Sequence, residues 1–219
     1  MTMKHIGFIF DMDGVIVDNM RIHETAWLAL FTDLGLTINI KEFHHKTAGM
    51  KAIEVLRYFL GTRFSNAELV QFSAQKEFLY RVLFRKKLKA LTGLPTFLKD
   101  AQRRRIPMAV ATGGGKPNID FILDGLHLRK YFRSVLGAND VMHGKPHPEI
   151  YLKSAVALAI APSDCIVFED ALPGIEAARC AGMQVVGIAT THPISVLRKV
   201  PSVRLAAKNF AHLSPKQFL

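Results

Sequence analysis

Two acidic residues one position apart, Asp11 and Asp13, are the first residues whose types and spacing could do chemistry. They directly follow residues 5–10, an apolar run that predicts a buried strand. Two carboxylates at the mouth of a strand can share a hard cation and still perform different tasks. Asp11 could attack phosphorus and form an aspartyl-phosphate, and Asp13 could protonate the leaving oxygen and later deprotonate water. Alone, the pair is hardly distinguishable from a capping or loop pair of aspartates.

A hydroxyl residue and a run of glycines follow residues 107–111, which also predict a strand. Thr112 precedes Gly113 and Gly114, and Lys116 opens a helical pattern. Backbone N–H groups at the start of a helix form a natural cradle for phosphate. Three consecutive glycines are also typical of a plain flexible turn, so this segment is informative only together with the others.

A lysine and a second acidic pair complete the set of candidate residues. Lys145 precedes a helix that begins with prolines, so it could offer a fixed cation to phosphoryl oxygens; a surface lysine is the usual alternative. Glu169 and Asp170 come at the end of the predicted strand 164–168. Adjacent carboxylates suit Mg²⁺, which takes one or two of them and keeps several waters, but they could also simply cap the next helix.

The elements that must position these residues alternate between strand and helix patterns. Five short, nearly continuous apolar runs predict strands buried on both faces of a parallel sheet: residues 5–10, 107–111, 134–136, 164–168 and 184–189. Helical patterns lie after or between them: residues 93–104, 116–126, 146–158 and 173–181. The alternation predicts an α/β fold with a doubly wound (Rossmann-like) parallel sheet. Ligands of such sheets bind beyond the carboxyl ends of the strands, which is where the polar segments lie.

One long stretch interrupts this alternation. From about Met20 to Phe84 the sequence has helical periodicity and no convincing strand. We therefore expect an inserted all-helical domain over residues 18–87, with residues 1–17 and 88–219 forming the α/β core and its catalytic site. An insert that must hinge freely makes a monomer the simplest expectation.

The composition limits the possible partners. The 219-residue chain carries a net charge of +11, which favours anionic ligands in general. Its basic runs, residues 85–87 and 103–105, lack the interleaved aromatic residues of a single-strand binding platform. We therefore expect no specific nucleic-acid partner, and the purpose of the high charge stays open.

The apolar runs and the cysteines bear on location. No apolar run reaches the roughly 18 residues that a membrane helix needs, so we expect no membrane partner. The apolar stretch 5–10 leads directly into Asp11 and Asp13 and does not resemble the core of a signal peptide. Cys165 and Cys180 do not make a disulfide framework, which favours a reduced cytoplasmic setting.

Taken in order, each behind a predicted strand, the polar segments resemble the four motifs of the haloacid dehalogenase superfamily. The resemblance covers essentially the whole chain and is carried by the segments FDMDGVIVDN, VATGGG, GKPHPEIY and FEDALPGIEAARCAGM. These are most similar to the β-phosphoglucomutases and related sugar-phosphate phosphatases, which carry a helical cap between the first two motifs. A non-catalytic protein on the same fold would not need the complete set of acidic and basic residues.

The resemblance implies a role for each motif residue. Asp11 would be the nucleophile and Asp13 the acid/base, while Thr112 and Lys145 would hold the transferring phosphoryl group. By the same resemblance, the Mg²⁺ site would be formed by Asp11, the backbone carbonyl of Asp13, Glu169 and Asp170. Relatives that cleave carbon–halogen or carbon–phosphorus bonds lack a carboxylate at the position of Asp13, so phosphate esters or anhydrides are the expected substrates.

Three residues of the helical insert resemble positions of the β-phosphoglucomutases. His23 matches a histidine that helps to position the acid/base aspartate, with a helix-surface histidine as the alternative. Trp27 also matches, but we expect it to be a core aromatic residue. Lys76 falls where that family keeps a substrate-facing lysine, and a solvated helix lysine is an equally good interpretation.

The loop 47–55 departs from the mutase pattern. Gly49 is kept, but the mutases have a lysine where this chain has Ala48, an arginine at Ala52 and a serine at Val55. The missing arginine removes a bidentate grip on a second phosphate, which Lys51 or Lys116 could replace only as a point charge.

These differences favour one reaction over another. We expect a Mg²⁺-dependent phosphatase that acts on a small phosphorylated metabolite, with Met50 and His23 among the residues facing the substrate. A β-phosphoglucomutase that interconverts glucose 1-phosphate and glucose 6-phosphate is the alternative.

Overall fold

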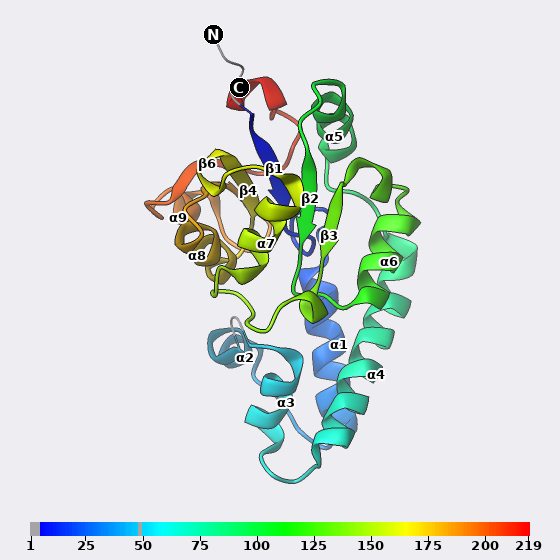
Figure 1. Ribbon diagram of the computed structural model, residues 1–219. Coiled ribbons are helices and arrows are strands. Elements are labelled where there is room, and N and C mark those ends of the chain that lie inside the picture. Colours follow the sequence, from blue (N-terminus) through cyan, green and yellow to red (C-terminus); the bar gives the residue numbers. More distant parts are fainter. Residues whose placement is uncertain (1–4, 48–49) are drawn as a thin grey trace. The chain divides into compact units, whose positions relative to one another are not determined.

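The computed structural model describes residues 5–47 and 50–219, which form two compact units (Figure 1). One unit contains Met1–Asp18 and Lys89–Leu219, and the other contains Asn19–Leu88. The first is called the α/β unit below and the second the helical unit.

The α/β unit contains a six-stranded parallel sheet with the strand order β3-β2-β1-β4-β5-β6. The strands are β1 (Gly7–Phe10), β2 (Met108–Ala111), β3 (Ser134–Leu136), β4 (Cys165–Glu169), β5 (Gln184–Ile188) and β6 (Val203–Ala207). The predicted doubly wound sheet is therefore confirmed. From β1 the next two strands along the chain are added on one side and the last three on the other, so the strand order switches between β1 and β4. Folds of this kind bind ligands at such a switch point.

Helices accompany the strands on the α/β unit. They are α5 (Leu94–Arg103), α6 (Lys116–Gly125), α7 (Glu149–Leu158), α8 (Leu172–Cys180) and α9 (Ile194–Leu197). Prolines occupy the first turns of α5, α6 and α8, where a backbone donor is not needed. The helix expected from residue 146 begins only at Glu149, because residues 144–147 form a turn that the His147 N–H closes onto the Gly144 carbonyl at 3.0 Å.

Both faces of the central strands are buried, which explains their continuous apolar sequences. On one face Ile9, Val167 and Val185 pack against residues of α7 and α8. On the other face the ring of Phe10 stacks on Phe168 at 4.6 Å between centroids, within a larger group of aromatic rings. This double layer fixes the carboxyl ends of β1 and β4 side by side.

The helical unit consists of α1 (Met20–Asp33), α2 (Ile40–Thr47), α3 (Ala52–Leu60) and α4 (Asn66–Phe84). Its apolar faces meet in a single core that contains Trp27, as expected, and the following residues: Leu30, Phe31, Phe43, Val55, Leu56, Leu60 and Leu69. Ser65 caps α4 in a capping box with Glu68, whose carboxylate accepts the Ser65 N–H at 2.7 Å. Among the described residues, no helix combines the length and the apolar character needed to cross a membrane.

Candidate active site

The register of the sheet brings three predicted acidic residues together at the ends of β1 and β4. Phe10 pairs with Phe168, and the Asp11 N–H donates to the Phe168 carbonyl at 3.0 Å. Carboxylate oxygens of Asp11, Glu169 and Asp170 consequently lie within 4.8 Å of one another, and all three residues are buried. Such a concentration of negative charge in a buried place requires cations.

Lys145 supplies a cation from the turn before α7. Its Nζ donates to Asp11 Oδ1 at 2.6 Å, to Glu169 Oε1 at 2.7 Å and to the Ala111 carbonyl at 3.2 Å. The three donors of the ammonium group are thus all used. The prediction that Lys145 belongs to the site rather than to the surface agrees with this placement.

The pKa values of Asp11 and Lys145 follow from this burial and pairing. Burial raises the pKa of Asp11 well above its usual value; Lys145 lowers this pKa, and the charges of Glu169, Asp170 and Asp13 raise it. Burial by itself would lower the pKa of Lys145, but Asp11 and Glu169 more than offset it and hold that pKa well above normal. Lys145 is therefore charged at neutral pH, whereas the carboxylates still repel one another.

Asp170 is held by two hydroxyl groups that follow β5. Its Oδ2 accepts from Thr190 Oγ1 at 3.3 Å and from Thr191 Oγ1, and Thr190 also donates to the Gly14 carbonyl at 2.6 Å. Burial and the charge of Glu169 raise the pKa of Asp170 to about 7, although the Thr191 hydrogen bond lowers it. Gly14 has a φ of +81°, and a Cβ there would overlap the Asp170 carboxylate.

Glu169 is anchored on both oxygens. Oε1 accepts from Lys145 and from the buried Tyr151 hydroxyl at 2.8 Å, while Oε2 accepts the N–H groups of Asp170 at 2.9 Å and Ala171 at 3.0 Å. The site residues predicted from the sequence do not include Tyr151, Thr190 or Thr191. A signal existed for the threonines only, because they are polar residues placed directly after a strand.

Replacement of Tyr151 by Phe tests this anchoring. The pKa of Tyr151 is raised by burial and by Glu169, so the phenol keeps its proton and donates it. Loss of a hydrogen bond to a charged acceptor should lower the free energy of unfolding by about 1.5–3 kcal/mol. Chemical denaturation checks this, with Tyr131→Phe, a change in a partly exposed tyrosine, as the matched control. Equal effects of the two changes would contradict the anchoring role.

The glycine-rich segment after β2 lies next to these residues. The buried Thr112 hydroxyl accepts the Gly114 N–H at 2.9 Å, and a Cβ on Gly114 would lie 3.8 Å from Asp13 Oδ2. Asp13 also contributes to raising the pKa values of Asp11 and Asp170. Gly113 is exposed with open space around it. The fold therefore places Thr112, Gly114 and Asp13 near the carboxylates of Asp11 and Asp170.

Lys116 does not join this group in the structure. Its side chain is 81% exposed and pairs with Asp120 one turn further along α6. An exposed i,i+4 pair of this kind contributes little to stability.

Two predicted residues of the helical unit contact each other. Lys76 Nζ lies 2.8 Å from His23 Nδ1 and 2.8 Å from Glu77 Oε1, and it also lies 4.9 Å from the centre of the Trp27 ring. The Lys76 side chain is only 3% exposed, so the interpretation as a solvated helix lysine is wrong. The ring of His23 stacks on Tyr80 at 3.8 Å, so it is not a plain surface histidine.

The predicted loop residues of the helical unit are less constrained. Met50 is 38% exposed, and Lys51 precedes α3 with its N–H donating to Glu54 at 2.7 Å. Gly49 lies outside the described residues. Val55, which stands where mutases have a serine, is 4% exposed and packs in the helical core.

Comparison with known proteins gives the family. Residues 7–182 match the haloacid dehalogenase-like hydrolases. The chain is 32% identical to fructose-1-phosphate phosphatase YqaB of Escherichia coli over 188 residues, which cover 86% of this chain and 98% of that protein. It is 29% identical to β-phosphoglucomutase of Bacillus subtilis over 193 residues, 85% of this chain and 84% of the relative.

A solved structure agrees with the sequence matches. The HAD hydrolase of family IA, variant 3, from Entamoeba histolytica superposes with a TM-score of 0.88 at 25% identity, over 97% of both chains. The extent of the family match and the site at the ends of β1 and β4 lead to the same conclusion: the chain belongs to the haloacid dehalogenase-like hydrolases.

Proposed function

We propose that this hydrolase is a Mg²⁺-dependent phosphatase that transfers the phosphoryl group of a small phosphorylated metabolite to Asp11. The observation that carries the proposal is the contact of Lys145 with both Asp11 and Glu169, which sets a buried cation against the proposed nucleophile. The charged lysine lowers the pKa of Asp11 against the effect of burial and so favours the ionised, nucleophilic form. The similarity to a sugar-phosphate phosphatase supports the same reaction.

Each residue of the site has a separate role in the two steps of the reaction. An Asp11 oxygen forms a bond to phosphorus while the bond to the leaving oxygen breaks, and Asp13 gives that oxygen its proton. Asp13 then takes a proton from water, whose oxygen attacks phosphorus and releases Asp11. Lys145, the Thr112 hydroxyl and the N–H groups around Gly114 bind the phosphoryl oxygens and stabilise the charge that develops on them.

The acidic residues fit a magnesium ion. Asp11, Glu169 and Asp170 supply hard oxygen ligands. Burial is the largest cause of the raised pKa values of Asp11 and Asp170, and a cation bound by these carboxylates would favour their ionised forms. We propose that Asp11, Asp170, Glu169 and the Asp13 carbonyl hold the ion. When bound, Mg²⁺ neutralises charge on the phosphoryl group.

Magnesium binding should depend on pH. The pKa of Asp170 is about 7, so a proton competes with the ion below pH 7. A raised carboxyl pKa contributes stability at low pH that is lost as the pH rises through 7, so Mg²⁺ should restore stability mainly above that value. We expect Mg²⁺ to raise the thermal midpoint more at pH 8 than at pH 6, measured against EDTA. Asp170→Asn should remove the difference, and equal shifts at both pH values in the unmodified protein would contradict the account.

Substrate selection is assigned to the helical unit. We propose that Asn19–Leu88 acts as a cap and that the His23–Lys76 pair contributes to substrate binding. Burial of the Lys76 charge is costly even though it is paired with Glu77, which favours a functional reason for its position. The same pair favours the second candidate, a β-phosphoglucomutase. The burial of Val55 and the loss of the arginine at Ala52 favour the phosphatase, since neither residue can bind a second phosphate.

A phosphate-release screen tests the proposal. It covers sugar phosphates, nucleotides, phosphoglycolate and pyrophosphate with Mg²⁺, and β-glucose 1-phosphate with a trace of the bisphosphate is checked for glucose 6-phosphate. Mg²⁺-dependent phosphate release from one group of compounds, absent in Asp11→Asn, is the expected result. Isomerisation without phosphate release would show a mutase, and no turnover of any compound would contradict both candidates.

A further inference from the structure

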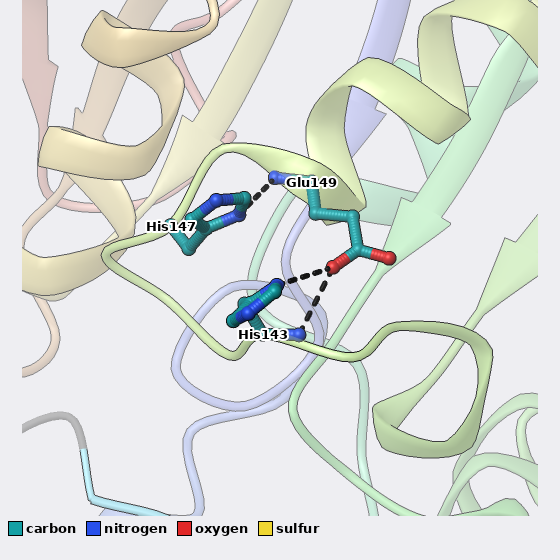
Figure 2. Close-up of side chains that lie close together, drawn as sticks. All are labelled: His143, His147 and Glu149. Atoms are coloured by element: carbon teal, nitrogen blue, oxygen red, sulfur yellow. Dashed lines mark hydrogen bonds and ion pairs between the residues drawn. The ribbon is translucent and has the colours of Figure 1, made fainter.

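A second group of metal-ligating side chains lies in the segment that leads into α7 (Figure 2). His143, His147 and Glu149 each offer one ligand atom, and these atoms lie within 4.8 Å of one another. Both histidines are exposed, and Glu149 is partly buried. None of the three takes part in the phosphoryl transfer proposed above. We propose that these residues, the His–His–Glu site, bind a transition-metal ion of the zinc class.

The backbone holds the three residues together without a metal. The N–H groups of Met142 and His143 donate to the Glu149 carboxylate at distances from 2.9 to 3.2 Å, and the Gly144–His147 turn brings the second ring next to the first. The centroids of the two rings are 4.5 Å apart. A site whose ligands are already gathered loses less conformational entropy when an ion binds.

The contacts that the two imidazole rings make with Glu149 are long. His143 Nδ1 lies 3.3 Å from Glu149 Oε2, and the Glu149 N–H points to His147 Nδ1 at 3.3 Å (Figure 2). Hydrogen bonds of this length are weak, so a metal ion that displaced them would cost little binding free energy. Hydrogen bonds from Lys153 and from the loop N–H groups lower the pKa of Glu149 to about 2, which keeps this carboxylate ionised at neutral pH.

The donor atoms of the His–His–Glu site favour a different ion from the one that the active site favours. Two imidazoles and one carboxylate form a common ligand set of Zn²⁺, with a fourth position left for water. Tetrahedral ligands at roughly 2.0–2.2 Å from zinc lie about 3.3–3.5 Å apart, a distance that exposed histidines can reach by small rotations. The carboxylates of Asp11, Glu169 and Asp170 offer oxygen alone and favour Mg²⁺. Saturation with Mg²⁺ should therefore leave the His–His–Glu site open to Zn²⁺.

The test is a calorimetric titration of the tag-free protein with Zn²⁺ in the presence of saturating Mg²⁺. We expect one equivalent to bind, and His143→Ala or His147→Ala to weaken it at least roughly tenfold, since even residues that only orient a ligand have effects of 10–100-fold. His212→Ala, a change in another exposed histidine of the α/β unit, is the matched control and should bind as before. Co²⁺ in place of Zn²⁺ should give visible absorption bands that disappear in the same two variants.

One further variant separates loss of ligands from loss of structure. Lys153 pairs with Glu149 at 2.7 Å, so its positive charge opposes an incoming cation. Lys153→Met should tighten Zn²⁺ binding, which a damaged protein would not do. The proposal is overturned if Zn²⁺ does not bind to the Mg²⁺-saturated protein, or if His143→Ala and His147→Ala bind it unchanged. Unchanged affinity in Lys153→Met would contradict Glu149 as a ligand.

Discussion

Asp11→Asn should abolish phosphate release, with a decrease in kcat on the order of 10⁴-fold or more, as removal of a nucleophile does in other enzymes that form covalent intermediates. The amide oxygen of asparagine can still accept from Lys145, whose Nζ lies 2.6 Å from Asp11 Oδ1. The side chain keeps its shape and loses its charge and its nucleophilicity. Steady-state kinetics on the substrate found by the screen measures the effect.

The stability of Asp11→Asn distinguishes chemistry from folding. Burial and the charges of Glu169 and Asp170 raise the pKa of Asp11, so the ionised form is unfavourable in the folded protein without metal. The variant should therefore unfold in EDTA at a midpoint no lower than that of the unmodified protein at pH 8. Turnover within tenfold of normal would refute Asp11 as the nucleophile. A large fall in the unfolding midpoint would contradict the inference that the ionised form of Asp11 is unfavourable in the folded protein.

Lys145→Met should have the second largest effect because it removes the cation between two buried carboxylates. Asp11 and Glu169 then face each other without compensation, and loss of one partner from a buried ion pair costs about 3–5 kcal/mol of unfolding free energy. The loss should become smaller as the pH falls, because protonation of Asp11, whose pKa is raised, removes one of the two charges. Turnover should fall by roughly 10²–10³-fold, as when a single charge-stabilising donor is removed.

A control and a second variant accompany this prediction. Lys153→Met removes an exposed lysine, 49% accessible and paired with Glu149, and should change the unfolding free energy by no more than about 1 kcal/mol. The double change Lys145→Met with Glu169→Gln removes one of the two uncompensated charges and should recover part of the stability. Chemical denaturation in EDTA measures all three. Equal losses in Lys145→Met and Lys153→Met would contradict a buried ion pair.

Five of the six strands could be predicted from the sequence, and four of these five lie inside the sheet, where both of their faces are buried; the fifth, Ser134–Leu136, is a partly buried strand at one edge. A strand such as Gly7–Phe10 must be apolar at every position, and this leaves a continuous run that periodicity detects. The sixth strand, Val203–Ala207, lies at the edge of the sheet with Arg204 and Leu205 exposed. An edge strand needs no continuous apolar run, so local sequence gave no sign of it.

The candidate site divides in a similar way. Asp11, Lys145 and Asp170 could be predicted because each stands in a local motif of recognisable spacing. Tyr151 could not, since its contact with Glu169 joins positions 18 residues apart through the packing of α7. Thr191 stands directly after a strand, but its contact with Asp170, 21 residues away, depends on where β5 ends. The burial of Lys76 depends on neighbouring helices in the same way, and its own helix gives no indication of it.

The measurement that tests the central claim most directly is the detection of a phosphorylated Asp11. The Asp13→Asn variant is mixed with acetyl phosphate and Mg²⁺, because its acetate leaving group needs no proton while hydrolysis of the aspartyl-phosphate lacks its base. The quenched protein is reduced with borohydride and digested, and mass spectrometry locates the modified residue. We predict conversion at Asp11 to the reduced alcohol and no other modified carboxylate. Modification of a different residue would contradict the account. Turnover of acetyl phosphate by a variant with Asp11 replaced by Asn would contradict it as well.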